Sequence, residues 1–400
     1  MRRAATLAAL ATAARGCGTA ADCSFAGACV AAACVCERGF MGATCATLDN
    51  TTRVPLSNGF RLPDFHVWGS QVAYDGSDGL YHMAASVYPR ALPFLHSWLY
   101  TASIVTASSR TPLGPYALDD AAALPQGAPG AWDRNVMNPK LLRAPGGGPW
   151  LLFYTGNAYE GATPSAGGAP LPANQSAAQA SQRCGLATAA SPRGPFTRRG
   201  APVISPRAEP AWDSRIISNV AVTPLGAYAG DTRLLAIYKA SSPAGAGTVQ
   251  TRVCFGAAIA AAYDAPFVRV SDEPILPCPD DTFYAEDPTV WVDATTRALH
   301  LVFKDFKGTF SPGEGYCGAH AVSSDGGRTW ALTRPALAYT TTHVWADGVA
   351  RKQHAQERAQ VLLNETDGAP IAMFYATDTD TDGSERYYNL AIPARPEALL

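Results

Sequence analysis

One pattern of paired strands recurs five times between about residue 60 and the end of the chain. Each copy has a short apolar segment, and these read LYHMAASVY, WLLFYTGN, RLLAIYKAS, ALHLVFKDF and PIAMFYATD. Another strand-like piece precedes each segment across a connection rich in Gly, Asp and Pro, which are the residues that tight hairpin turns require. Such repetition restricts the chain to folds in which copies of one antiparallel sheet pack side by side.

A four-stranded antiparallel sheet repeated five times closes into a ring, since radial repetition leaves only short sheet edges exposed. The sequence therefore predicts an all-β fold, a five-bladed β-propeller over residues 55–398. No stretch has helical periodicity, no strand is followed by a phosphate-binding glycine loop, and no G-x-S-x-G motif occurs. Nucleotide-dependent enzymes and serine hydrolases therefore lack support.

The fourth repeat contains a turn pattern that resembles an Asp-box, made of Ser323, Asp325, Gly327, Thr329 and Trp330. We expect Asp325 to accept hydrogen bonds from backbone amides of the turn and Trp330 to pack between sheets. We interpret this motif as architecture.

Six of the ten cysteines lie in the first fifty residues, within CGTAADCSFAGACVAAACVCERGFMGATC. A module this short cannot hold itself together by burial alone and needs crosslinks or a metal. The cysteine spacing, with Gly39, Phe40 and Gly42 between the last two cysteines, resembles an EGF-like domain over residues 16–48. The resemblance implies the pairs Cys17–Cys29, Cys23–Cys34 and Cys36–Cys45, and no bound calcium, because the acidic residues of calcium-binding members are missing. A zinc cluster is the alternative, although no histidine accompanies these cysteines.

The other four cysteines are scattered, and Cys254 and Cys278 are only 24 residues apart. We predict a disulfide between these two. Cys184, Cys254 and Cys317 occupy equivalent third-strand positions in three blades, which makes pairing among them difficult.

Several features favour an oxidising, extracellular compartment. Residues 1–15 have two arginines followed by an Ala- and Leu-rich stretch, as in a signal peptide. Even numbers of cysteines in both groups favour disulfides. Glycosylation sequons begin at Asn50, Asn174 and Asn364. We expect a glycoprotein that is secreted or held at the cell surface, with no membrane-spanning segment. The formal charge of -2, without a basic stripe, argues against nucleic acid as a partner.

In a propeller, the first strand of each blade lines the central channel, so its leading residues converge on one axial cavity. The five predicted starts are Gly69 and Ser70, Met137 and Asn138, Ser218 and Asn219, Glu286 and Asp287, and Glu357 and Arg358. The segments AWDRNVMN and AWDSRIISN add Trp132, Asp133, Trp212 and Asp213 to the same rim. The sequence thus predicts several carboxylates around one pocket.

At these positions the chain resembles glycoside hydrolase families 43 and 32 over roughly residues 60 to 395. Those enzymes take an Asp from each of two Asp-Pro starts and a Glu two positions before a proline-like site. Asp287 matches an Asp-Pro start, and Glu357 matches the Glu start with alanine in place of proline. Blade one reads WGSQV where an Asp would be expected, so the base or nucleophile would come from Asp213, Asp133 or Asp64, or be lost.

The resemblance implies hydrolysis of glycosidic bonds in poly- or oligosaccharides, for which one carboxyl group protonates the leaving oxygen and another activates water or attacks carbon. We expect Asp287 to face the axis and raise the pKa of the general acid Glu357, with Glu286 supporting from the side. The candidate catalytic residues are Asp287, Glu357, Asp213, Asp133 and Glu286. The candidate sugar-binding residues are Trp68, Trp132, Trp212, Asn138, Asn219, Arg358, His320 and Lys304, with Trp345, His66, His343 and His354 also available. We expect no metal and no cofactor.

Each candidate also has an ordinary structural interpretation. The tryptophans are then core residues, Asp133 and Asp213 cap turns, Glu286 and Asp287 form the polar lip of a strand, and Lys304 neutralises Asp305.

Two other functions stay open. The missing acid in blade one favours a carbohydrate-binding or extracellular interaction propeller without turnover. With either function, we expect the EGF-like module to mediate extracellular contacts. The Asp-box suggests a sialidase, but only Arg358, with Arg134 and Arg215 nearby, is available to bind a substrate carboxylate.

Overall fold

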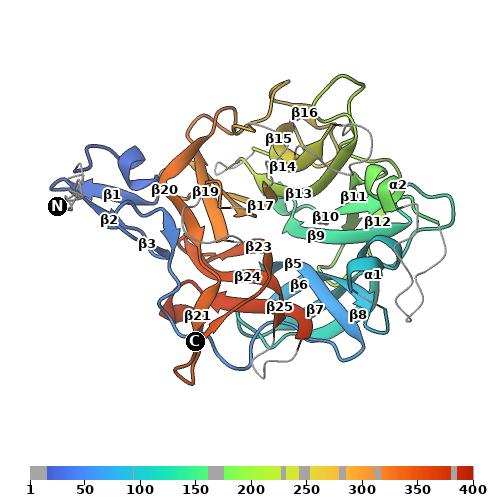
Figure 1. The fold of residues 1–400 in the computed structure, drawn as a ribbon, viewed down its shortest axis with the longest axis horizontal. Helices are drawn as coiled ribbons and strands as arrows, with labels where there is room; N and C mark the ends of the chain where they lie inside the picture. Colours follow the sequence, from blue (N-terminus) through green and yellow to red (C-terminus); the bar gives the residue numbers. More distant parts are fainter. Residues whose placement is uncertain are drawn as a thin grey trace, which may run out of the picture.

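The computed structural model describes residues 16–92, 94–160, 175–226, 231–242, 253–278, 285–306, 308–310, 317–379 and 385–399. Five antiparallel sheets surround a common centre, and a small N-terminal module lies outside this ring (Figure 1). The predicted all-β, five-bladed propeller is confirmed. The predicted signal peptide and the Asn174 sequon lie outside the described residues. No described helix is both long and apolar enough to cross a membrane.

Each blade is a meander whose first strand is innermost. Blade one contains β5 (Phe65–Asp75), β6 (Leu80–Pro89), β7 (Ser103–Ser109) and β8 (Ala117–Leu124). Blade two contains β9 (Asn135–Arg143), β10 (Trp150–Asn157), β11 (Arg183–Ala189) and β12 (Thr197–Arg198). Blade three contains β13 (Ile216–Pro224), β14 (Leu234–Ser241), β15 (Val253–Ala260) and β16 (Val268–Arg269). Blade four contains β17 (Ala285–Val292), β18 (Leu299–Asp305), β19 (Cys317–Ser323) and β20 (Ala331–Tyr339). Blade five contains β23 (Gln356–Leu363), β24 (Pro370–Thr379) and β25 (Glu385–Pro393).

The remaining elements are short. The N-terminal module contains η1 (Ala20–Cys23), β1 (Gly27–Val30), β2 (Ala33–Cys36), β3 (Phe40–Met41) and β4 (Thr47–Leu48). The helices α1 (Phe94–Tyr100) and α2 (Gln175–Ala180) precede the third strands of blades one and two. The others are η2 (Pro145–Gly147), the hairpin β21 (Thr342–Val344) and β22 (Ala350–Lys352), and η3 (Pro396–Leu399).

The chain closes the ring by pairing its beginning with its end. Phe60, which precedes blade one, forms an antiparallel bridge with Asn389 of β25, with N–O distances of 2.9 and 3.1 Å in the two directions. Phe60 therefore occupies an outer position on blade five and partly covers the edge of its last strand. This contact ties the first blade to the last.

Blades pack through apolar side chains that alternate along their strands. One buried cluster joins Phe153 and Leu151 of blade two to Ile217 and Val222 of blade three, and similar clusters lie between the other pairs. Glycine is required at Gly185 and Gly256, where an added Cβ would lie 2.4 and 2.3 Å from the Cζ of Tyr154 and Tyr238. The two tyrosines cross their neighbouring third strands there, which brings their hydroxyls to the blade loops.

The Asp-box forms the expected turn. Asp325 Oδ1 accepts hydrogen bonds from the backbone amides of Arg328 and Thr329, both at 3.0 Å. Trp330 packs against the apolar cluster between blades three and four. This motif is therefore structural.

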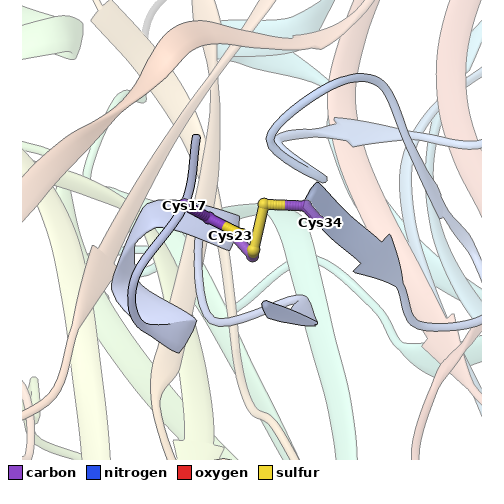
Figure 2. Close-up of side chains that lie close together, drawn as sticks. All are labelled: Cys17, Cys23 and Cys34. Atoms are coloured by element: carbon purple, nitrogen blue, oxygen red, sulfur yellow. A yellow bond between two sulfur atoms is a disulfide. The ribbon is translucent and has the colours of Figure 1, made fainter. Parts of the chain in front are cut away.

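The four predicted disulfides are present. In the N-terminal module Cys17 pairs with Cys29, Cys23 with Cys34, and Cys36 with Cys45. Figure 2 shows the Cys23–Cys34 bond, with Cys17 nearby. Because all six sulfurs are in disulfides, these cysteines offer no thiolate to a zinc ion. In blade three Cys254 pairs with Cys278.

The N-terminal module packs against blades four and five. Its Phe40, Cys45 and Leu48 share one buried cluster with Trp291 and Tyr339 of blade four. Thr47 Oγ1 donates to the backbone oxygen of Leu337 at 2.9 Å, and Thr44 Oγ1 to that of Arg334 at 2.8 Å.

Two fully buried histidines of blade four lie beneath this contact. The Nδ1 atom of His300 and the Nε2 atom of His320 are 2.9 Å apart, and His320 Nδ1 is 2.7 Å from the backbone oxygen of Ala46. Burial lowers the pKa of His320 to about 4 and that of His300 well below its usual value of 6.5. Across the same contact, burial and the neighbouring Asp293 raise the pKa of Glu37 to about 7.

The histidine pair predicts an acid-sensitive contribution to stability. A histidine whose folded pKa is depressed stabilises the fold above pH 6.5, and this contribution is lost as the pH falls toward 4. Glu37 acts in the opposite direction, so the effect has to be isolated by substitution. From pH 7 to pH 5, each histidine accounts for about 2 kcal/mol, so we expect the native protein to lose about 4 kcal/mol more unfolding free energy than a His300→Gln, His320→Gln double variant. Urea titrations at both pH values measure this, and equal losses would contradict it.

Candidate active site

The five first strands all carry the same irregularity where they reach the axis. In each, one residue with a positive φ interrupts the register with the second strand: Gly69 (53°), Asn138 (54°), Asn219 (48°), Asp287 (60°) and Arg358 (56°). Such a β-bulge adds one residue to the inner strand and turns its backbone. We call these five residues the axial ring. In blade one the equivalent pair is Trp68 and Gly69, one residue earlier than the sequence suggested.

Side chains of the axial ring bond to one another across the channel. Asn138 Nδ2 donates to Asn219 Oδ1 at 2.9 Å, and Asn219 Nδ2 donates to Asp287 Oδ1 at 3.0 Å. Asp287 also accepts from the backbone amide of Arg358 at 3.1 Å and from its guanidinium. Burial raises the pKa of Asp287 to about 6, and the Arg358 guanidinium opposes this rise.

The same packing accounts for the missing acid of blade one. A Cβ on Gly69 would lie 3.1 Å from Asn138 Oδ1 and 3.5 Å from Cγ of Arg358. Arg358 and Asn138 therefore take the space that an aspartate at this position would need. A hollow of about 20 Å³, lined partly by the axial ring, is large enough for about one water molecule.

A larger cavity has a volume of about 450 Å³, and Asn138, Asn219 and Arg358 of the axial ring contribute to its lining. In four blades, the residue that directly precedes the axial-ring residue in the sequence also lines this cavity: Trp68, Met137, Glu286 and Glu357. They share one side because successive residues of a strand point in opposite directions. Asp287 belongs to the axial ring and lines only the small hollow. Glu286, in contrast, lines the cavity together with Glu357.

Two lysines hold these glutamates. Lys239 Nζ lies 2.8 Å from Glu286 Oε2, and Lys304 Nζ lies 3.7 Å from Glu286 Oε1 and bonds Glu357 Oε1. Burial would raise the pKa of Glu286, but Lys239 and Lys304 outweigh it and hold that pKa well below its usual range. Although burial disfavours its charge, the pKa of Lys304 is raised by Glu357 and Glu286. The contacts therefore favour an ionised Glu286.

One carboxylate oxygen from each of Glu286, Asp287 and Glu357 lies within 4.8 Å of the others. This group has the size of a cation site, but Lys239, Lys304 and Arg358 already match its three negative charges. A metal ion would have to displace these ammonium and guanidinium groups.

Aromatic side chains form one wall of the cavity. Phe94 of α1 stacks on Tyr387 of β25 with ring centroids 4.2 Å apart, and Trp68 lies 4.6 Å from Phe94. Trp98 and Phe306 also line the cavity. Near them, His354 Nδ1 lies 2.7 Å from Asp378 Oδ2. The cavity thus combines apolar ring faces with paired carboxylates.

Of the sequence-predicted site residues, the structure brings Trp68, Asn138, Asn219, Glu286, Glu357 and Arg358 to this cavity, with Lys304 behind the glutamates. Lys304 bonds Glu357 rather than simply neutralising Asp305. His354 also lines the cavity.

The two Trp-Asp pairs do not line the cavity. Asp133 bonds Tyr154 at 2.7 Å and Arg198 at 2.9 Å, and the equivalent Asp213 bonds Tyr238 and Arg269. Trp132 and Trp212 stack on these tyrosines, and their indole nitrogens donate to the backbone oxygens of Gly200 and Asp272. These residues connect each blade to its outer loops, and the two carboxylates do so by bonding tyrosine and arginine side chains rather than by capping turns.

Several other candidates also lie elsewhere. His320 and Trp345 are buried under the N-terminal module. His343 bonds Gln356 at 2.9 Å, and His66 packs edge-on against Tyr387. Asp64 is exposed before β5.

Sequence reasoning missed Lys239 and the aromatic wall. A signal for Lys239 existed, because IYKAS and VFKDF put a lysine at equivalent buried positions of repeats three and four. Lys239 pairs with Ser218 in the sheet register, as Lys304 pairs with Glu286. The wall residues Phe94 and Trp98 come from α1, whose position no repeat predicts.

Comparisons with known proteins agree on the fold. No protein-family model matches the chain, and no curated protein matches it. A solved structure of a BT0996 RGII complex is similar over 87% of this chain and 92% of its own, with 13% identity and a TM-score of 0.59. A family 117 glycoside hydrolase from the marine bacterium Zobellia galactanivorans is 17% identical over 85% and 87%, with a TM-score of 0.53. A thermostable family-43 glycoside hydrolase is 13% identical over 83% and 90%, with a TM-score of 0.51.

Because Arg358 is the cation of the axial ring, we expect its removal to destabilise the fold strongly. Arg358→Met leaves Asp287 buried without its guanidinium partner, which we expect to lower the unfolding free energy by about 3 kcal/mol or more. Adding Asp287→Asn should recover part of that loss, because the uncompensated charge disappears. Urea denaturation of both single variants and the double variant measures the coupling, and strictly additive effects would contradict it.

Proposed function

We propose that this chain is a carbohydrate-active enzyme that hydrolyses glycosidic bonds of oligo- or polysaccharides in the 450 Å³ cavity. The observation that carries the proposal is the pair Glu286 and Glu357, which line the cavity with oxygens within 4.8 Å of each other. Glycoside hydrolysis requires two carboxyl groups on either side of the scissile bond. The cavity gathers such a pair although its members come from different blades.

The surroundings support the same activity. Trp68, Phe94 and Tyr387 present ring faces beside the glutamates, and such faces suit the apolar side of a sugar ring. Two fold neighbours are glycoside hydrolases, of families 43 and 117. Glu286 stands two positions before Pro288, the Glu-x-Pro spacing that the family resemblance gives for a catalytic glutamate. We therefore assign the catalytic pair to Glu286 and Glu357, with Asp287 organising the axial ring.

A carbohydrate-binding propeller without turnover is the second candidate. Gly69 replaces the acid of blade one, and lysines already neutralise both cavity glutamates. The sialidase alternative has less support, since Asp287 binds Arg358, and neither Arg134 nor Arg215 lines the cavity.

The remaining assignments follow from the sequence and the disulfides. We propose a signal peptide at residues 1–15, an EGF-like module at 16–48 and the enzyme domain at 55–398. Four disulfides suit an extracellular, secreted glycoprotein.

Activity screening of the purified protein tests the enzyme proposal. We expect turnover of at least one substrate among aryl glycosides, including furanosides, and plant or algal polysaccharides. Glu286→Gln and Glu357→Gln should each lower turnover by about 10² or more, because an amide keeps the shape but loses the acid–base function. Glu365→Gln, at an exposed position, is the matched control.

The outcomes separate the two candidates. Binding of a glycan without release of product would favour the carbohydrate-binding propeller. Full activity of both glutamate variants would exclude the assigned pair.

A further inference from the structure

A second pocket lies at the opposite ends of the strands from the cavity. It has a volume of about 170 Å³ and lies between blades three and four, where the β17–β18 hairpin and the Asp-box turn meet the end of β13. On β17, Glu286 lines the cavity near the start of the strand, whereas Val292 lines this pocket at its end. The two sites are therefore about one strand length apart, roughly 20 Å. We call it the arginine pocket, after Arg233, Arg297 and Arg328.

The three arginines come from three different turns. Arg233 directly precedes β14, Arg297 lies in the β17–β18 hairpin, and Arg328 lies in the Asp-box turn. No carboxylate of the described residues lines the pocket with them. Because the whole chain has a formal charge of -2, this local excess of positive charge is not a general property of the surface.

The contacts of these arginines leave positive charge available to a ligand. Arg233 is paired, since its Nη2 lies 2.8 Å from Asp231 Oδ2. Arg328 Nη1 instead donates to the backbone oxygen of Asp325 at 2.9 Å, and Arg328 forms no ion pair with any described residue. A backbone oxygen orients a guanidinium group but carries no full charge to neutralise it. The exposed side chain of Arg328 therefore keeps an uncompensated charge at the pocket.

Arg297 connects the two blades at the pocket. Its Nη2 donates to the backbone oxygen of Leu225, directly after β13, at 3.3 Å. Its φ is 64°, a conformation that glycine adopts at less cost. The turn is held by Asp293, whose Oδ1 accepts hydrogen bonds from the amides of Thr295 and Thr296 at 3.0 and 2.6 Å. The turn alone therefore does not require an arginine at this position, but the arginine side chain lines the pocket.

The rest of the lining is mostly aliphatic. Leu225, Ile259 and Val292 are partly exposed and pack against the apolar cluster between blades three and four, to which the buried Leu299 belongs. Aliphatic surface beside guanidinium groups suits a ligand that joins an apolar face to an anionic substituent. A sugar ring with a carboxylate or a sulfate ester has this pattern, because its C–H groups form an apolar face. The side chain of an aspartate or glutamate has too few C–H groups to cover four aliphatic residues.

We infer that the arginine pocket is a second carbohydrate-binding site, which takes one anionic sugar residue of an acidic polysaccharide through its carboxylate or sulfate group. Guanidinium groups bind both kinds of oxyanion through paired N–H donors. The volume is below the roughly 300 to 1,000 Å³ of pockets for drug-sized ligands, so a single residue enters rather than a length of chain. The choice of a carbohydrate ligand rests on the proposed function.

Calorimetric titration of the native protein tests the ligand class. The probes are galacturonate oligosaccharides, sulfated galactan oligosaccharides and neutral galactan oligosaccharides of matched length. We expect a Kd of about 1 mM for at least one acidic series, at least tenfold tighter than for the neutral series. The affinity should fall several-fold from about 20 to about 200 mM NaCl, because salt screens exposed charges. The tighter acidic series identifies the group as carboxylate or sulfate, and equal or absent binding of all three series would overturn the inference.

A double variant assigns the binding to the pocket. Arg297→Gln with Arg328→Gln should weaken binding of the acidic oligosaccharides tenfold or more, because an amide supplies no positive charge. Arg53→Gln with Arg110→Gln is the matched control, since it removes two exposed arginines outside the pocket and changes the net charge equally. Equal losses in both double variants would overturn the inference. Circular dichroism verifies folding, and Arg328→Gln alone, at an exposed position, should already weaken binding about threefold.

The outcomes also separate this inference from the proposed function. Turnover of an aryl glycoside without preference for acidic oligosaccharides would overturn the arginine pocket as a binding site and leave the proposed enzyme intact. Pocket-dependent binding without turnover of any substrate would support the pocket and contradict the enzyme. Poly-glutamate that binds at the pocket as tightly as the acidic oligosaccharides would overturn the choice of a carbohydrate.

Discussion

The bonding of the axial ring is the interaction on which the rest of the molecule depends. Five blades bring five strands to one point, where their backbones would leave polar groups without partners in a space too small for bulk water. The positive-φ bulges turn each strand there, and the side chains of Asn138, Asn219, Asp287 and Arg358 bond to one another across the axis. Glycine, asparagine and aspartate adopt this conformation at little cost, but arginine does not. Asp287 binds both the backbone amide and the guanidinium of Arg358, which compensates for the strain at that position.

The ring also determines which side chains reach the cavity. Because each bulge fixes the phase of its strand, the residue before it points to the opposite side, and Glu286 and Glu357 are brought together from neighbouring blades. Their charges are tolerated in a buried site because two lysines lie on second strands beside the bulges. Lys239 is opposite Ser218 in blade three, and Lys304 is opposite Glu286 in blade four. The bulges of the first strands therefore determine both the position of the two glutamates and the lysines that compensate their charge.

The N-terminal module is stabilised by its disulfides and by packing against the propeller. Its disulfides replace a hydrophobic core that so short a segment cannot form. Its apolar residues pack against the propeller, as Phe40 does against the ring of Trp291 in blade four. The module therefore covers apolar and histidine side chains that a propeller alone would expose to water. It lies on the outer part of blades four and five, whereas Phe94 and Tyr387 belong to the axial cavity.

By itself the sequence determined the number of blades, the four disulfides and most of the axial residues. These follow from features that short segments carry alone: strand periodicity, cysteine spacing, and polar residues at the start of a repeated strand. Only the tertiary structure decided which polar residues act together. Asp133 and Asp213 were indistinguishable from site residues in sequence, but Tyr154 and Tyr238 draw them toward the blade loops. Conversely, Glu286 and Glu357 are far apart in the sequence. They contact the same lysine only because closure of the ring brings the bulged first strands of blades four and five together. Contacts between residues of different blades depend on how the ring closes. No local pattern in the sequence specifies how the blades are placed relative to one another.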